Sequence, residues 1–420
     1  MRQQVEKTKN TKAAWAKIGR LKPTGPVADW QAFFSQEFDR AYKPPNTFFM
    51  WNDLAWQIYD RFMESLSARS AHWTPVASEL LRFHGHLFLL MRLEQLFRSD
   101  HRVYMQGFFN KYLHYFFANV DNLSNHEINE EFEPLVERAM VILRNRLLLG
   151  IPVRGIDWQI LYRLLWQELF QRGPWAEQEI AHLQDLLEKD DLSPDGRYQA
   201  LFARAHFAIA ANDDDRARSV LEKLSGQYLY TIVRDLRFYL EGFSQQQQWD
   251  RLLQWLRWLI PYTSLSDTVN YEALCIYWNQ VAVACNVRGE FMGALRQWLP
   301  RSRRLYSQYL LEMGEHRRWA ELWVAYGANP LELPRDELSI VEAREPASLL
   351  PLYHHQVIRL IGQKNRQAYK EAIKWLKKLR TLYKKIKRTS DWERYMHTLT
   401  ERYSRLRALQ EELRKGKLIS

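Results

Sequence analysis

The chain has 420 residues, is 46% hydrophobic and 14% aromatic, and carries a net charge of +11. Its many large aromatic side chains exclude a mainly disordered protein, because they supply the buried apolar area that folding requires. At roughly 100 to 200 residues per domain, the length predicts two or three units or one extended array. Its two cysteines, Cys275 and Cys285, exclude a disulfide framework and a metal site built from cysteine alone.

The first segment, residues 1–22, is basic, with seven Lys or Arg against one acid. It has few large apolar side chains, so we expect it to be flexible. It lacks the apolar run of about 7 to 15 residues found in secretory signals. The longest apolar runs elsewhere fall short of the ~20 residues needed to cross a bilayer. The sequence therefore predicts a cytoplasmic protein with no membrane partner.

Residues 23–190 show long helical patterns separated by Gly and Pro clusters, for example at 43–45 and 150–155. No run alternates apolar and polar residues in the manner of a half-buried strand. Trp and Phe recur at helical spacing, which is more typical of a core than of a base-stacking platform. The pattern predicts an aromatic-rich helical domain and an all-α chain.

Residues 196–328 contain pairs of helical patterns of similar length joined by short turns. The pairs cover 198–210 with 216–224, 271–287 with 291–298, and 305–313 with 316–326. These stacked helical hairpins are similar to a tetratricopeptide-like solenoid, although the signature positions of that motif are not filled. An acidic, proline-bearing stretch, residues 329–348, is predicted to be a linker.

The last region, residues 349–420, is predicted to form three helices, over 349–361, 367–387 and 391–413. The middle helix is strongly basic, because residues 364–388 hold eleven Lys or Arg against one acid, a net charge of +10. Its apolar positions recur at three and four residues, so the lysines fall on other faces. We expect the basic helix and the last helix to pack as an antiparallel hairpin that leaves the lysines in solvent.

The sequence contains no motif that is typical of an enzyme active site. A phosphate loop needs a glycine-rich turn ending in Lys and Ser or Thr, and none occurs. His84 with His86, and His354 with His355, lack the i, i+4 spacing of helical metal ligands. The acidic run at 213–215 has no nucleophile or base partner and suits a helix start. We therefore expect no metal, no cofactor and no enzyme activity, and an enzyme is the least favoured class.

The basic helix supplies the candidate nucleic-acid contacts. They are Lys370, Lys374, Lys377, Lys378, Lys384, Lys385 and Arg388. Such cations attract phosphates through counterion release and without sequence preference. Trp375 lies off the centre of the apolar stripe, where it is a candidate for stacking on a base or on a partner helix. An ordinary solvated helix, or one that binds an acidic protein surface, has the same pattern.

Three segments resemble bacterial SWIM zinc-finger family proteins, chiefly those of Gram-positive bacilli. They are YKEAIKWLKKLRTLYKKIKRTSDWERYMHTLTERYSRLRALQEELRKGKL at 369–418, GRLKPTGPVADW at 19–30 and PVRGIDWQILYRLLW at 152–166. The resemblance covers most of the chain. Its motifs belong to a helical region and include no catalytic residue.

The zinc module of that family uses a C-x-C followed by a C-x-H, and this chain has no C-x-C. The resemblance is therefore to the helical C-terminal region alone, and it implies zinc for the missing module but not for this chain. The family is thought to act near nucleic acid, beside Swi/Snf-type helicase-like ATPases. We expect a non-enzymatic adaptor that holds such a partner and contacts nucleic acid. The alternative is a pure protein-interaction scaffold.

Overall fold

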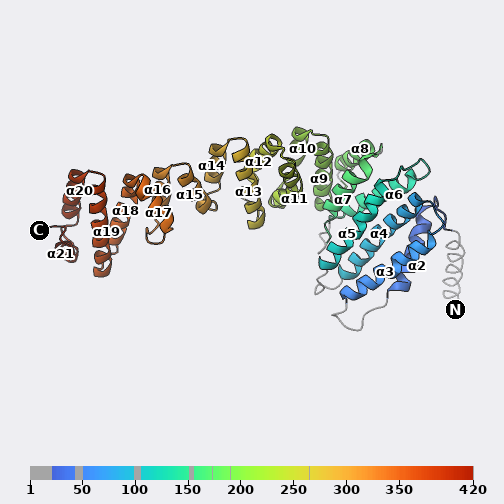
Figure 1. The fold of residues 1–420 in the computed structure, drawn as a ribbon, viewed down its shortest axis with the longest axis horizontal. Helices are drawn as coiled ribbons and strands as arrows, with labels where there is room; N and C mark the ends of the chain where they lie inside the picture. Colours follow the sequence, from blue (N-terminus) through green and yellow to red (C-terminus); the bar gives the residue numbers. More distant parts are fainter. Residues whose placement is uncertain are drawn as a thin grey trace. The chain divides into compact units, whose positions relative to one another are not determined.

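The computed structural model describes residues 21–42, 51–98, 106–150, 156–172, 174–189, 191–263 and 265–419. Within these ranges the chain forms twenty α-helices and three short 3-10 helices, and no β-strand. The predicted all-α class is confirmed. The chain divides into two compact units, Met1–Leu229 (unit 1) and Tyr230–Ser420 (unit 2) (Figure 1). The segment predicted to be flexible, residues 1–22, lies almost wholly outside the described residues.

Unit 1 is built around one apolar helix. Its elements are α2 (Val27–Ala41), α3 (Trp51–Arg69), α4 (Pro75–Arg98), α5 (Gln106–Ser124), α6 (Glu133–Leu148), α7 (Trp158–Glu168), η2 (Phe170–Arg172), α8 (Trp175–Lys189), α9 (Pro194–Ala210) and α10 (Asp214–Leu221). Nearly every side chain of α4 between Leu80 and Leu90 is buried, and α2, α3, α5 and α6 all pack on it. A helix that is buried on nearly every face must be enclosed by other helices.

Aromatic rings fill the core of unit 1. Phe62 of α3 stacks on Phe88 of α4, with ring centroids 6.0 Å apart, and Phe34 of α2 lies 5.6 Å from Phe88. Trp166 of α7 meets Phe207 of α9 edge to face at 4.8 Å. The predicted core role of these aromatic residues is confirmed, since all of them are buried.

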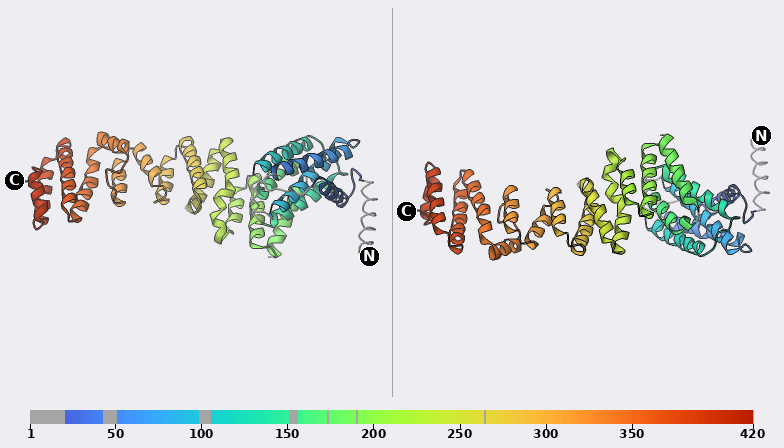
Figure 2. Two further views of the ribbon diagram at one scale, coloured as in Figure 1. Left: turned by 90° about the horizontal axis from the view of Figure 1, so that it is seen from below. Right: turned by 90° about the horizontal axis from the view of Figure 1, so that it is seen from above.

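In unit 2, the helices are α11 (Ile232–Gln245), α12 (Trp249–Thr263), α13 (Thr268–Ala284), α14 (Arg288–Gln297), α15 (Arg303–Glu312), α16 (His316–Ala325), α17 (Arg335–Arg344), α18 (Leu350–Gly362), α19 (Arg366–Lys385), α20 (Thr389–Arg402) and α21 (Arg407–Lys415). Helices α11 to α15 each pack on the next helix in the chain, whereas α17 packs on α15 and α16 packs on α18 (Figure 2). Short 3-10 turns, η3 (Gly226–Tyr230) and η4 (Pro346–Leu349), precede α11 and α18. The stacked hairpins predicted from the sequence are present.

One turn geometry recurs at the ends of α9, α11, α13, α15 and α19. A residue with positive φ follows each helix: Asn212, Gln247, Asn286, Gly314 and Lys387. The next amide donates to a carbonyl five residues back, as from Glu315 to Leu310 at 2.7 Å and from Arg388 to Tyr383 at 2.9 Å. This is the Schellman motif, which satisfies carbonyls at a helix end and reverses the chain in few residues.

Two sequence-based boundaries are wrong. The predicted linker, residues 329–348, contains α17, and its buried Glu337 accepts hydrogen bonds from Ser307 Oγ at 2.7 Å and Trp319 Nε1 at 2.8 Å. This segment is therefore part of the packed unit. The predicted last helix, residues 391–413, is two helices, because the chain turns between Arg402 and Arg407.

Candidate nucleic-acid interface

Helix α19 forms the basic surface at the C-terminal end of unit 2. The Asn365 side chain caps it by accepting a hydrogen bond from the Ala368 amide at 2.8 Å. Its apolar face is buried against α18, α20 and α21. The buried residues are Ala368, Tyr369, Ala372, Ile373, Trp375, Leu376, Leu379, Leu382 and Tyr383. Because this face is buried, the side chains between these positions are left in solvent.

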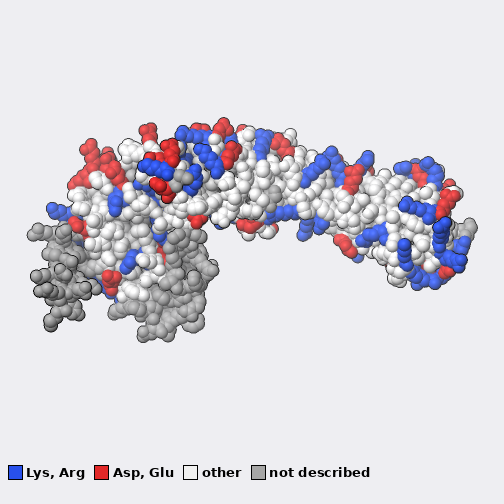
Figure 3. Space-filling model, turned by 180° about the vertical axis from the view of Figure 1, so that it is seen from behind, with Lys and Arg blue, Asp and Glu red and all other residues white. Residues whose placement is uncertain are grey.

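The six lysines of α19 share that solvent side, and we call it the lysine face. Its members are Lys370, Lys374, Lys377, Lys378, Lys384 and Lys385, all of which are exposed. At about 100° per residue they fall within an arc of roughly 120°, opposite the buried residues. On the side of the molecule drawn in Figure 3, Lys and Arg side chains gather over the C-terminal helices. The predicted exposure of these lysines is confirmed.

Three of these lysines form an open row. Lys370, Lys377 and Lys384 are seven residues apart, and none makes a side-chain hydrogen bond or an ion pair with the described part of the chain. At 1.5 Å rise per residue, neighbours in this row are about 10.5 Å apart along the helix axis. The row therefore spans about 21 Å with its ammonium groups available to a ligand.

The other four predicted cations have partners within the protein. Lys374 pairs with Glu371 at 2.7 Å, and Lys378 Nζ lies 4.4 Å from the centre of the Trp375 ring. Lys385 donates to the backbone carbonyl of Glu342 at 3.0 Å, and Arg388 pairs with Asp391. Exposed pairs of this kind are weak, so a strong anion can displace them at little cost.

Trp375, a candidate for stacking on a base or on a partner helix, is not accessible to a base. Its side chain is only 4% exposed, and its ring packs against Tyr353 of α18 with centroids 5.0 Å apart. The ammonium group of Lys378 lies over this ring. Trp375 belongs to the α18–α19 core, because its position places it over the helix that precedes α19 in the chain.

Aromatic and histidine side chains fix the hairpin beneath the lysine face. His354 Nε2 lies 2.9 Å from the Tyr383 hydroxyl, and its ring centroid is 4.1 Å from that of Tyr395 on α20. Burial lowers the pKa of His354 to about 4, so the imidazole is neutral at pH 7. Sequence reasoning considered His354 only as a doubtful metal ligand and missed this packing role.

Ion pairs tie the first turn of α19 to α21. Arg366 Nε lies 2.9 Å from Glu412, and Arg366 Nη2 lies 2.9 Å from Glu411. The hydrogen bond from Arg366 lowers the pKa of Glu412, with a smaller contribution from Lys370. Arg366 therefore holds α19 and α21 together, and α19 itself carries one acid, Glu371.

The histidines at 84 and 86 are structural. His84 Nε2 lies 3.0 Å from the Leu135 carbonyl, and His86 Nδ1 lies 3.2 Å from the Tyr112 hydroxyl, all buried in unit 1. No three His, Cys, Asp or Glu side chains are grouped as metal ligands within the described residues. No described helix is long and apolar enough to cross a membrane.

A second unusual surface lies on α13. Val269, Ile276 and Val283 are 64%, 59% and 58% exposed and recur every seven residues, so they form one stripe. The sequence pattern did not reveal this stripe, because α13 is apolar on nearly all faces and resembles a buried helix. A stripe of three exposed β-branched residues is a candidate contact for another protein.

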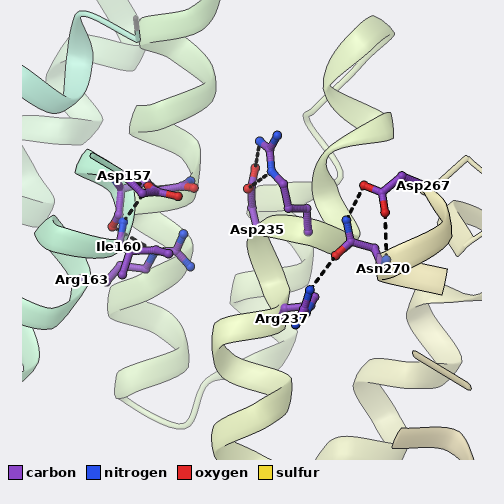
Figure 4. Close-up of polar contacts among 9 residues, drawn as sticks. Asp157, Ile160, Arg163, Asp235, Arg237, Asp267 and Asn270 are labelled. Carbon is purple, nitrogen blue, oxygen red and sulfur yellow. Dashed lines mark hydrogen bonds and ion pairs between the residues drawn. The ribbon is translucent and has the colours of Figure 1, made fainter. Parts of the chain in front are cut away.

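Polar contacts on both sides hold α13 to its neighbours. Arg237 of α11 donates to Asn270 at 3.4 Å, and Asn270 in turn donates to Asp267 at 2.7 Å (Figure 4). On the other side, the Tyr309 hydroxyl of α15 donates to Asn279 at 2.9 Å. These contacts fix α13 with its apolar stripe uncovered. Within unit 1, Figure 4 also shows Asp157, whose carboxylate caps α7.

The fold and these surfaces define a helical-hairpin array with a basic C-terminal helix. The chain is 28% identical over 414 residues to the uncharacterized protein YwqB of Bacillus subtilis (strain 168). The alignment covers 94% of this chain and 74% of that relative, so it includes most of both units. No protein-family model matches the chain. No solved structure matches it either.

Proposed function

We propose that the chain is a non-enzymatic helical adaptor that binds nucleic acid through the lysine face and holds a protein partner on unit 2. The observation that carries the first half is the exposure of six lysines on one side of α19, with a single acid among them. Such a surface gains free energy from releasing the counterions condensed on a polyanion. Lysine contacts to phosphate position the ligand without reading its sequence.

The stripe on α13 supports the second half of the proposal. Its seven-residue repeat is the spacing at which helices contact one another in coiled coils, so we expect an amphipathic helix of the partner to lie along it. Arg237 and Arg301 lie beside the first turn of α13, where Arg301 donates to the Ser266 carbonyl at 2.6 Å. These cations and the helix N-terminus favour acidic residues at the adjoining end of the partner helix.

The SWIM-family resemblance suggests a Swi/Snf-type helicase-like ATPase as this partner. The test is complex formation between the purified chain and such an ATPase by size-exclusion chromatography. We expect V269S/I276S/V283S to abolish the complex and the four-lysine variant described next to retain it. Equal complex formation by the stripe variant and the wild type would remove α13 from the proposal.

Nucleic-acid binding is tested with labelled DNA across a salt series. If about six cations contact phosphates, affinity should fall by roughly 10³ between 50 and 200 mM salt. The variant K374E/K377E/K378E/K385E should lose this binding. A matched control, R296E/R304E/R317E/R335E, makes the same change in net charge at exposed positions elsewhere on unit 2 and should retain it.

The second candidate function is a pure protein-interaction scaffold in which the lysines keep the surface soluble or meet an acidic protein. The exposed stripe of α13 favours it equally. If the wild-type chain does not bind DNA, or binds it without salt dependence, the scaffold function is favoured over the adaptor function. Loss of binding in both charge-reversal variants would show a dependence on net charge rather than on the lysine face.

A further inference from the structure

We infer that the lysine face of α19 takes double-stranded DNA in preference to single strands. This inference rests on the proposed nucleic-acid function and adds the class of ligand to it. It is carried by two features of the surface: the lack of an accessible aromatic ring beside the lysines, and the straight, regular spacing of the open row. Each feature favours binding of duplex DNA over binding of single-stranded DNA.

Proteins that bind single strands pair a basic groove with aromatic rings on which the unpaired bases stack. The lysine face has no such ring. Trp375, Tyr383 and Trp392 are each less than a tenth exposed, and they pack on one another or on α18. Among the described residues, the exposed tyrosines, Tyr115, Tyr230 and Tyr326, lie outside α19. An unpaired base would therefore find no exposed aromatic ring of α19 on which to stack.

The open row suits a stiff, dense array of phosphates. Lys370, Lys377 and Lys384 lie on one straight helix at intervals of about 10.5 Å. Duplex DNA presents one charge per ~1.7 Å of axis and keeps its phosphates in fixed positions on both sides of a groove about 12 Å wide. Lysine side chains are flexible, so they cover the difference between the lysine interval of about 10.5 Å and the groove width of about 12 Å. A single strand has half this charge density and must be straightened to meet the row.

The charge density also predicts a difference in salt dependence. The slope of log affinity against log salt is about −0.9 per phosphate contacted in duplex DNA and about −0.7 in single strands. Six contacts would give slopes of about −5.4 and −4.2. Both the affinity and the magnitude of the slope should therefore be larger for the duplex, and one salt series gives both values.

The experiment compares a 30-base-pair duplex with a 30-nucleotide oligo(dT), each fluorescently labelled, from 50 to 200 mM salt. The full chain should bind the duplex at least tenfold more tightly at every salt concentration. Equal or tighter binding of oligo(dT) would overturn the inference while leaving the proposed function in place. A lack of salt-dependent binding to either probe would overturn the proposed function, and the inference with it.

Two matched triple variants locate the contact. K370Q/K377Q/K384Q removes the open row, and K374Q/K378Q/K385Q removes three lysines that already have partners, with the same change in charge. For the duplex, the open-row variant should reduce the magnitude of the salt slope by about 2.7, and the second variant by less. Equal reductions would show that the row has no special part. Circular dichroism verifies that both variants keep the wild-type helix content.

Discussion

The two units place their charged and apolar side chains in opposite ways. Among the described residues, unit 1 buries seven Asp, Glu, Arg or His side chains and exposes three large hydrophobic ones. Unit 2 buries three Asp, Glu, Arg or His side chains and exposes ten large hydrophobic ones. Unit 1 has a wide core that also contains charged side chains in ion pairs, such as Glu94 with Arg146 and Glu179 with Arg144. Unit 2 is an array whose helices contact mainly their chain neighbours, so more of each helix stays at the surface.

This difference predicts that substitutions at buried charged positions of unit 1 destabilise the fold more than substitutions at exposed positions of unit 2. A buried ion pair or histidine in unit 1 costs free energy when its partner or its charge state changes. An exposed lysine or valine in unit 2 costs little when replaced, and is therefore free to serve a ligand. Four measurements test the contrast, starting with the largest effect.

Acid should unfold unit 1 before unit 2. Burial lowers the pKa of His84 to about 4 and the pKa of His86 and His206 to about 3. The unfolded chain protonates these histidines below about pH 6.5 and the folded chain does not, so stability falls as pH decreases from 6.5 toward 4. At about 1.4 kcal/mol per pH unit each, three histidines cost about 6 kcal/mol at pH 5. Among the described residues of unit 2, the one histidine whose pKa is lowered in the same way is His354, which is only partly buried.

Hydrogen exchange resolved by peptide at pH 7.5 and 5, corrected for intrinsic rates, separates the two units. His86→Gln should lessen the acid sensitivity of unit 1, whereas replacing the exposed His114 by Gln should leave it unchanged. Earlier loss of protection in unit 2 than in unit 1 would contradict the contrast.

Breaking a buried ion pair should cost more than breaking an exposed one. Glu94 of α4 is fully buried and pairs with Arg146 of α6, so Glu94→Ala leaves that guanidinium without its carboxylate. We expect a loss of about 3 kcal/mol in the free energy of unfolding. In unit 2, Glu321 pairs with Arg317 in solvent, and Glu321→Ala should cost about 0.5 kcal/mol or less. Urea unfolding measures both, and equal losses would remove the distinction.

Unit 2 buries few charged side chains, and that of Glu337 is one of them. Glu337 accepts hydrogen bonds from Ser307 and Trp319, and so connects α17 to α15 and α16. Glu337→Ala leaves a buried hydroxyl and a buried indole N–H unsatisfied, at a cost of about 2 kcal/mol. The control is Glu342→Ala on the same helix, which removes an exposed side chain and should be neutral within about 0.5 kcal/mol. If Glu337→Ala leaves the free energy of unfolding unchanged, residues 329–348 act as a linker after all.

Most helices of the array were predictable because their apolar residues recur at three and four positions. The basic helix was predicted over 367–387 and found at Arg366–Lys385. The helix α17 was missed because its proline and acidic residues are typical of loops. Its stabilising contact joins Glu337 to Ser307, thirty residues away, and no local pattern contains that information. The turns that end in Gln247 and Lys387 were equally hidden, since neither residue favours positive φ.

The candidate site was predictable only in part, for a related reason. The side of α19 that carries lysines follows from the sequence, because charged side chains stay in solvent. The burial of Trp375 depends on Tyr353, a residue of another helix. The exposure of the α13 stripe depends on how α11, α12 and α14 pack on the other sides of α13. Burial at such positions is set by packing between helices, which a single sequence does not encode locally.

The stripe on α13 allows the contrast to be tested within a single helix. Val269→Ser, Ile276→Ser and Val283→Ser change residues that are more than half exposed, so each should alter the free energy of unfolding by about 0.5 kcal/mol or less. Leu274 lies on the opposite, fully buried side of the same helix, and Leu274→Ala should cost about 2 to 5 kcal/mol. Urea unfolding gives both values. If the stripe substitutions cost as much as Leu274→Ala, those residues belong to the core of the folded chain and cannot be its docking surface. If they cost little, folding does not require these side chains, as the proposed docking surface demands.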